Sequence, residues 1–536
     1  MEVKLEQLKE SIKSSDWKRV SEIILELEKT HPKKIPINML KTIIEQGSGR
    51  APTHSMRILS NLALQDEEAR QSFFQYLSSP SDGLRCLAFM AMTMSFSTSD
   101  YVILPSNVVL RLIQDPVPGI RKSILSILLS IAKKIPNKIP IYILYKAMLK
   151  EEDALHREQI LKIANIINPV DQPSRTIKID TLYLINWIRK QASIQSTKVH
   201  ELLGDICAKY IGGSQEFHLV RALITESCVV DAFLFLMPKR YRGHEIHQFN
   251  VGVLGLFLLK MYISDSETLE EYIRKLKKWK DCEDVEKCWL VTAFLHDHAI
   301  PIEYMFKTAP ITFEYGKIFP SYSTAYKFFH KALDEAYHNL ISSSLFEIYE
   351  KLLSGQDVSL RLKELISEEL TSIGYVHSVE KNQILDHGIL AAVNLTTRLR
   401  SKNDDFVDKN DLIKTAAKAI ALHNSSDKVE LKKEPIAFLL VLCDEIQEWE
   451  REVAFLPHVA AETSSIEIGP FKHEQGKLLF EDELSVTFDY SYGSRETLKQ
   501  TGWDYKIFKN GKNSTEKRLV FDPNIRPKKI VFKTLA

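Results

Sequence analysis

The sequence predicts a mostly α-helical protein in three parts: an α-solenoid in residues 1–170, an all-α domain in residues 178–460, and a small β or α+β domain in residues 464–536. Three observations lead to this prediction. A helical pattern recurs at a fixed spacing near the N-terminus, long runs with the 3.6-residue helical period follow, and short segments rich in β-branched and aromatic residues come last.

The N-terminal pattern is a weak internal repeat whose three clearest copies surround Arg85, Arg121 and Arg157, spaced 36 residues apart. In each copy a polar turn precedes the arginine, and apolar residues at helical spacing follow it. Stacked helix pairs of this period bury their apolar faces against neighbouring pairs. The pattern resembles HEAT or armadillo repeats over about residues 15–170, and an irregular helical bundle is the alternative. We expect a recognition scaffold that binds protein segments or nucleic acid.

The segment 168–174 contains two prolines and several turn-forming polar residues, which predicts a boundary after the repeats. Helical periodicity then continues to about residue 455. Beyond residue 464 the composition changes, and we expect a small sheet there. Its strands are predicted within the segments 464–471, 477–491, 503–514 and 518–535, with Asn510 and Gly511 as a turn signal.

Charge and hydropathy exclude several classes of protein. Lys plus Arg number 71 against 70 for Asp plus Glu, so no global field favours indiscriminate binding to nucleic acid or anionic lipid. The N-terminal residues lack the apolar core of a secretory signal. The most apolar stretch, 251–259, is far shorter than the roughly 20 residues that cross a bilayer. The six cysteines form no C-x-x-C pair. We therefore expect a cytoplasmic protein with reduced thiols and no membrane partner.

Histidine and aspartate residues recur at the ends of apolar helical segments in the central region. His244 and His247 lie near the start of one such segment, where a spacing of three places them on one helix face. His296 and Asp297 end another, in an apolar setting that would penalise an unpaired charge. Taken singly, a histidine at a helix start is usually a surface or capping residue, and a His-Asp pair at a helix end usually reaches solvent.

Three further residues continue the series. His387 opens a predicted helix, His423 closes another, and Asp444 follows the unbroken apolar run 436–443. A carboxylate in that setting needs a partner, because burying it alone costs several kcal/mol. One aspartate could pair with Lys or Arg. Five His and Asp elements in this order instead favour a metal centre.

The five elements resemble the HD superfamily of metal-dependent phosphohydrolases, whose ligand order is His, His-Asp, two optional His, then Asp; the two optional histidines belong to its two-metal branch. The resemblance covers about residues 240–455 and implies an all-α HD domain. Matched position by position, the implied metal ligands are His247, His296, Asp297, His387, His423 and Asp444. His244 would then support these ligands or face the substrate.

The resemblance implies two divalent transition-metal ions, because imidazole nitrogen and carboxylate oxygen suit Mn, Fe, Ni, Co or Zn. Asp297 would bridge the two ions and be central to catalysis. The other ligands would divide between them, with His247, His296 and Asp444 at one ion and His387 and His423 at the other. A hydroxide bridging such ions is expected to hydrolyse a phosphate ester or phosphodiester. The implied substrate is a phosphate-containing small molecule, of the nucleotide class.

The match to the family departs at the positions that would contact the substrate. The run after Asp297 lacks the lysine with which family members contact the substrate phosphate. That contact would have to come from Arg242, Lys381 or His298. The Gly-Tyr-Pro motif of the cyclic di-GMP phosphodiesterases is also absent after His423. The sequence therefore assigns no individual substrate.

Two other functions stay open. The same ligand order resembles the myo-inositol-oxygenase-like branch, which uses two irons to activate oxygen. A non-catalytic scaffold that senses a ligand through the HD fold is the third alternative. The identity of the metal ligands does not separate the hydrolase from the oxygenase.

Overall fold

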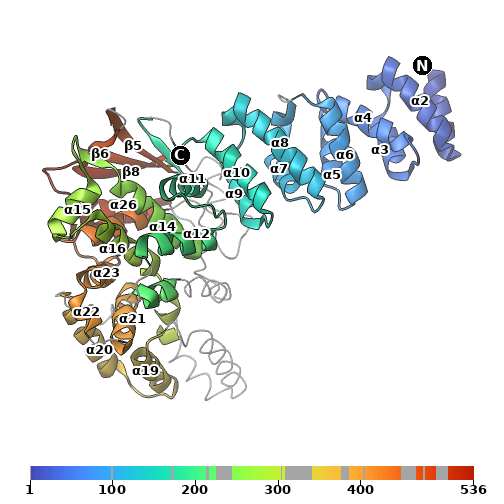
Figure 1. Ribbon diagram of the computed structural model, residues 1–536. Helices are drawn as coiled ribbons and strands as arrows, with labels where there is room; N and C mark the ends of the chain where they lie inside the picture. Colours follow the sequence, from blue (N-terminus) through green and yellow to red (C-terminus); the bar gives the residue numbers. More distant parts are fainter. Residues whose placement is uncertain are drawn as a thin grey trace. The chain divides into compact units, whose positions relative to one another are not determined.

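A computed structural model of the chain is drawn in Figure 1. It describes residues 2–97, 100–170, 174–212, 217–224, 244–303, 305–307, 341–375, 385–402, 405–447, 466–474, 477–489 and 505–535. The chain divides into two compact units, Met1–Pro169 and Val170–Ala536. The division falls within the proline-containing segment 168–174. Among the described helices, none is long and apolar enough to cross a membrane.

The first unit consists of short helices stacked in succession (Figure 1). They are α1 (Glu2–Lys13), α2 (Trp17–Thr30), α3 (Ile37–Gln46), α4 (Ala51–Ala63), α5 (Glu67–Leu77), α6 (Asp82–Ser95), α7 (Ser106–Ile113), α8 (Pro118–Lys134), α9 (Ile141–Lys150) and α10 (Ala154–Ile167). Helix α4 contacts α2 and α6, α7 contacts α5 and α9, and α8 contacts α10. Helix pairs therefore stack on their neighbours, while the likeness to HEAT or armadillo repeats stays a prediction.

The arginines that mark the repeat make equivalent contacts. Helices α6, α8 and α10 begin 36 residues apart, and Arg85, Arg121 and Arg157 are the fourth residue of each. Each guanidinium donates to a carbonyl six residues earlier, at Ser79 (2.9 Å), Asp115 (2.7 Å) and Glu151 (2.7 Å). Arg85 also donates from Nε to the buried Asp115 carboxylate at 2.7 Å. The repeated arginine thus satisfies carbonyls of the turn within each pair.

The second unit is built around apolar helices that contact one another. Its core helices are α14 (His244–Leu259), α16 (Cys282–Leu295), α21 (His387–Lys402), α23 (Asp411–Leu422) and α24 (Pro435–Ile446). Helix α16 contacts α14, α23 and α24, and α23 also contacts α21. Surrounding helices are α11 (Thr181–Ala192), α12 (Val199–Ile206), α15 (Leu269–Lys277), α19 (Ser343–Leu353), α20 (Ser359–Ser372) and α22 (Phe406–Lys409).

Two glycines of α14 permit its close approach to α16. A Cβ on Gly252 would lie 2.4 Å from the Phe294 ring, and one on Gly255 would lie 2.0 Å from the Trp289 ring. The indole Nε1 of Trp289 donates to the carbonyl of Gly252 at 2.8 Å. Any larger residue would separate the two helices. The glycines therefore let the histidine-bearing ends of α14 and α16 come together.

A mixed six-stranded sheet covers part of this unit. Its strands are β1 (Ile177–Ile179), β2 (Tyr262–Ser264), β3 (Glu267–Thr268), β5 (Ile466–Glu474), β6 (Lys477–Asp489) and β8 (Lys529–Leu535). Figure 1 labels β5, β6 and β8. Strand β6 is antiparallel to β5 and parallel to β2 and β8. The strands predicted within 464–471 and 477–491 are confirmed as β5 and β6. The sheet is not local to the C-terminus, since β1, β2 and β3 precede the core helices α16 to α24.

The strand and turn predicted over 503–514 are wrong. Residues Tyr505–Arg518 form a helix, α26, and Asn510 and Gly511 lie inside it. Glycine within a helix costs about 1 kcal/mol relative to alanine, so local preference disfavours this helix. Tertiary contacts offset that cost, because the buried Lys512 donates hydrogen bonds to the backbone carbonyl and the carboxylate of Glu445. The two-residue strand β7 (Leu519–Val520) follows and pairs with β4 (Val429–Glu430).

Asp180 is a buried carboxylate that makes the stability of this unit depend on pH. It caps α11 by accepting the Tyr183 N–H at 2.8 Å, and burial raises its pKa from 3.8 to about 6. A raised pKa favours the protonated form in the folded state. The contribution of this carboxyl group to the free energy of unfolding is therefore complete below pH 3.8 and is lost as the pH rises through about 6.

We expect Asp180→Asn to flatten this dependence, because asparagine caps a helix without a charge. As the pH rises from 4 to 7, the free energy of unfolding of the variant should increase relative to that of the unmodified chain by on the order of 2–3 kcal/mol. Denaturant unfolding of both proteins at several pH values measures this difference. Parallel curves for the two proteins would contradict the assignment to Asp180.

Candidate metal centre

The six predicted metal ligands come from the ends of the core helices. His247 lies in the first turn of α14, His296 ends α16 and Asp297 follows it. The other three are His387 at the start of α21, His423 at the end of α23, and Asp444 near the end of α24. Helix ends are suitable positions for metal ligands, since a helix end brings a polar side chain to the edge of an apolar core without breaking the helix.

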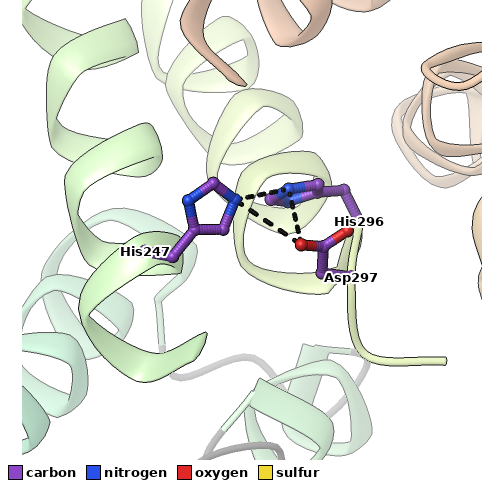
Figure 2. Close-up of side chains that lie close together, drawn as sticks. All are labelled: His247, His296 and Asp297. Carbon is purple, nitrogen blue, oxygen red and sulfur yellow. Dashed lines mark hydrogen bonds and ion pairs between the residues drawn. The ribbon is translucent and has the colours of Figure 1, made fainter. Parts of the chain in front are cut away.

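The first group consists of His247, His296 and Asp297, whose side chains converge in Figure 2. The Nε2 atoms of the two histidines are 3.3 Å apart, and each lies 3.5 Å from Oδ2 of Asp297. Asp444 joins them, with Oδ1 3.2 Å from Nε2 of His247 and 4.0 Å from Nε2 of His296. Two atoms that each lie ~2.1 Å from one tetrahedral ion are about 3.4 Å apart, so this spacing fits a shared metal ion.

The second group consists of Asp297, His387 and His423. The Oδ1 atom of Asp297 lies 3.2 Å from Nε2 of His387 and 3.8 Å from Nε2 of His423. Asp297 thus belongs to both groups and directs a different carboxylate oxygen to each. That is the arrangement expected of a carboxylate that bridges two ions.

All four histidines are held by their Nδ1 atoms, which leaves Nε2 facing the centre. The acceptors are Gln447 Oε1 for His247 (2.5 Å), Ala293 O for His296 (2.8 Å), Glu303 Oε2 for His387 (2.9 Å) and Ile420 O for His423 (2.6 Å). An acceptor at Nδ1 places the ring proton there, so that the Nε2 lone pair is available. Protein histidines that bind metals are commonly oriented in this way.

In the described part of the chain, the surroundings of the Nε2 atoms lack a partner that a metal ion would supply. The Nε2 of buried His423 has no hydrogen-bond partner among the described residues. The lone pairs of His247 and His296 point at each other over 3.3 Å, an unfavourable contact unless a cation lies between them. The Nε2 of His387 differs, because it already has neighbours: Oδ1 of Asp297 lies at 3.2 Å and the amide nitrogen of the exposed Asn424 at 2.7 Å. The donor set therefore fits metal ions at both groups.

The electrostatics of the centre favour a cation. Burial alone would raise the pKa of Asp297, but His296, His387 and His423 hold it well below its usual value. Burial lowers the pKa of His296 to about 4, which keeps this imidazole neutral. Burial would also lower the pKa of His387, but the carboxylates of Asp297 and Glu303 raise it to about 10. Positive charge is favoured at His387, whether as a proton or as a metal ion.

Glu303 is a supporting residue that was not predicted from the sequence. Its side chain is buried, accepts from His387 and pairs with Lys307. Burial by itself would raise the pKa of Glu303, but His387 and Lys307 lower it to about 2, so it stays ionised. An ionised partner at Nδ1 makes the histidine a stronger metal ligand. The only sequence signal was an acidic residue seven positions after His296.

We expect Glu303→Gln to weaken metal binding by about 10- to 100-fold, because the amide keeps the hydrogen bond but loses the charge. Titration of the metal-free protein with Mn²⁺ or Co²⁺ measures the change in affinity. Glu347→Gln is the matched control, since that exposed glutamate pairs with Lys351 at the same spacing of four residues. Equal affinity in both variants would show that Glu303 has no role at the metal.

The remaining predicted site residues differ in what can be said of them. His298 is buried with both ring nitrogens engaged, since Nδ1 donates to Leu295 O (2.5 Å) and Nε2 accepts from Asn394 (3.0 Å). This favours a structural role over contact with a substrate. His244 is the first residue of α14. Arg242 and Lys381 lie outside the described residues.

Gln447 and Gly388 also went unnoticed in the sequence. Gln447 is the residue directly after α24 and lies three positions after Asp444, which is about one helical turn. Gly388 follows His387, and a Cβ there would lie 2.7 Å from two atoms of the His423 ring. The helical spacing could have identified Gln447. Nothing local could have identified Gly388, because its neighbour comes from another helix.

Comparisons of this chain with protein-family models, with curated proteins and with solved structures found no match. The chain is a mostly helical protein in which two His and Asp groups share Asp297 and could hold metal ions.

Proposed function

We propose that this chain is a metal-dependent phosphohydrolase of the HD type that acts on a nucleotide or a related phosphate ester. The observation that carries the proposal is the bridging position of Asp297, whose two oxygens face two separate sets of histidine nitrogens. A pair of adjacent metal positions is a recurring feature of enzymes that displace groups at phosphorus. The order of the ligands in the sequence adds the resemblance to the HD superfamily.

The residues of the metal centre would have different roles in this reaction. Bound divalent ions would supply Lewis-acid activation of a phosphoryl oxygen and of the attacking water. With a metal ion in place of the proton favoured at His387, all four histidines would present neutral nitrogen donors, and Asp297 and Asp444 would offset the charge of the ions. His247, His296 and His423 are at most 4% exposed, so bulk water is largely excluded from their side. Asp444, with 28% of its side chain exposed, lies on the side open to solvent, from which a substrate would approach.

The test is a substrate screen on the full chain loaded in turn with Mn, Fe, Ni, Co, Zn or Mg. Nucleoside phosphates, cyclic mononucleotides, cyclic dinucleotides and oligonucleotides are incubated with each preparation. We expect hydrolysis of one class that stops on chelation and returns when the metal is restored. An Asp297→Asn preparation purified in parallel shows whether a contaminating phosphatase is responsible.

Two outcomes would overturn the proposal. Hydrolysis of none of these compounds, together with oxygen consumption on a polyol or phosphonate by the iron-loaded protein, would assign the centre to an oxygenase. Stoichiometric metal binding without turnover of any compound would favour a ligand-sensing scaffold.

A further inference from the structure

The hairpin formed by α23, β4 and α24 carries two ligands of the metal centre. His423 ends α23, and Asp444 lies near the end of α24, with the short strand β4 between the two helices. Their relative position therefore depends on how this hairpin is held. One continuous stretch near the C-terminus, residues 512–521, contacts the hairpin at several points, and we call it the clamp segment.

Arg518, the last residue of α26, binds the end of α23. Its three kinds of nitrogen each donate to a backbone carbonyl: Nη2 to Leu422 at 2.5 Å, Nη1 to His423 at 2.7 Å and Nε to Asp427 at 2.9 Å. The last carbonyls of a helix lack partners within the helix, and a cation there is favourable. The planar guanidinium donates to three carbonyls in fixed directions, whereas a lysine ammonium is a compact charge on a flexible chain and does not match this geometry.

Lys512, six residues earlier on α26, binds the end of α24. Its Nζ donates to the backbone carbonyl of Glu445 at 2.6 Å and to the carboxylate of the same residue at 2.8 Å. Only 5% of the Lys512 side chain is exposed, and the Nζ also lies 5.4 Å from the centre of the Phe488 ring. Glu445 is the residue after Asp444. Lys512 therefore fixes the backbone next to this ligand.

The clamp segment also contacts the middle of the hairpin. Strand β7 pairs in parallel with β4, with Val429 opposite Leu519, and the Leu431 N–H donates to the carbonyl of Val520 at 2.9 Å. The rings of Phe521 and Phe438 meet edge to face with centroids 4.8 Å apart. The hairpin is thus held at its first helix end, its connection and its second helix end by a single stretch of chain.

We propose that Arg518 and Lys512 are positioning residues of the metal centre, Arg518 acting through His423 and Lys512 through Asp444. The inference rests on the proposed metal-binding function and extends it to the C-terminal segment. Because the Nε2 of His423 lies near Oδ1 of Asp297 in the second group, while Oδ1 of Asp444 lies near Nε2 of His247 in the first, Arg518 and Lys512 are expected to have separable effects. Arg518 governs the affinity of the second metal position, and Lys512 governs that of the first.

The experiment compares Arg518→Gln, Arg518→Lys and Lys512→Met in the full chain by titrating metal-free protein with Co²⁺ and recording affinity and absorption spectrum. We expect Arg518→Gln to weaken one of two binding steps by about 10- to 100-fold and Lys512→Met to weaken the other by a similar factor. Arg518→Lys keeps the charge but should recover little of the lost affinity. Lys517→Gln is the matched control, since it removes one positive charge from an exposed residue of α26.

The two metal affinities of each variant distinguish general unfolding from displacement of a single ligand. A general destabilisation would weaken both binding steps in every variant, and that result would overturn the inference. Unchanged affinities in Arg518→Gln and Lys512→Met would also overturn it. Melting curves of the metal-free variants report the accompanying change in stability.

Hydrogen exchange of the metal-free protein tests the same contacts without any ion. We expect Arg518→Gln to speed exchange in peptides covering 420–430, and Lys517→Gln to leave them unchanged. If the unmodified chain binds no metal, the proposed function fails, and the exchange data still decide whether Arg518 holds His423. Equal exchange in both variants would contradict the positioning role.

Discussion

Asp297→Ala is expected to abolish metal binding and hydrolysis while leaving the fold in place. This residue is the one member that both ligand groups share, so its removal takes a carboxylate oxygen from each position. Losing several kcal/mol of transition-state stabilisation corresponds to a rate reduction of about 10³-fold or more. Metal content by elemental analysis, together with hydrolysis of the substrate found in the screen, measures the effect.

The fold should survive this change because the helices around the centre are held by apolar contacts. We expect the circular dichroism of Asp297→Ala to match that of the unmodified chain without metal. Glu283→Ala is the control, since it removes an exposed carboxylate from the same helix, α16. Retention of two ions by Asp297→Ala would show that Asp297 is not a bridging ligand.

Gly388→Ala is expected to empty the second metal position alone. The added Cβ would lie 2.7 Å from Cε1 and Nδ1 of His423 and 2.8 Å from the carbonyl of Ile420. A backbone atom is among these neighbours, so α21 and α23 must move apart or the His423 ring must turn. Overpacking of this kind costs about 1–3 kcal/mol, and a misplacement of ~1 Å at a catalytic centre can cost 10²-fold in rate.

The measurement is the number of ions bound per chain, expected to fall from two to one, together with a turnover rate about 10²-fold lower. Gly204→Ala is the matched control, since it adds the same methyl group to helix α12, where no atom lies within 4 Å of the new Cβ. Two ions bound by Gly388→Ala with unchanged affinity would contradict the close packing of α21 against α23.

The metal centre could be predicted in part because several of its ligands are polar residues next to apolar stretches of sequence. His296, Asp297 and Asp444 interrupt or end apolar runs, a contrast that is visible in the sequence itself. Their partners do not stand out, since Gln447 lies 200 residues from His247 and Glu303 lies 84 residues from His387. A glutamine or glutamate on a helix has many possible roles. Only the packing of the helices selects the one seen here.

The C-terminal segment shows the same limit for secondary structure. The β-branched and aromatic residues of β5 and β6 fit strands by local preference, and those strands form. Residues 505–518 contain the turn signal Asn510 and Gly511, yet they form α26. The hydrogen bonds of Lys512 to Glu445 of α24 and of Arg518 to the end of α23 outweigh the local preference, and both depend on residues more than 60 positions away.

The sequence by itself determined the helical class, the 36-residue spacing of the first unit and the residue types that could bind metal, because periodicity and contrast in polarity are local properties. Tertiary structure alone decided that Asp297 faces two histidine groups, that the histidines turn Nε2 toward the centre, and that Arg518 and Lys512 hold the hairpin bearing His423 and Asp444. These features depend on contacts between distant segments, which are set by packing and by the need to satisfy buried polar atoms.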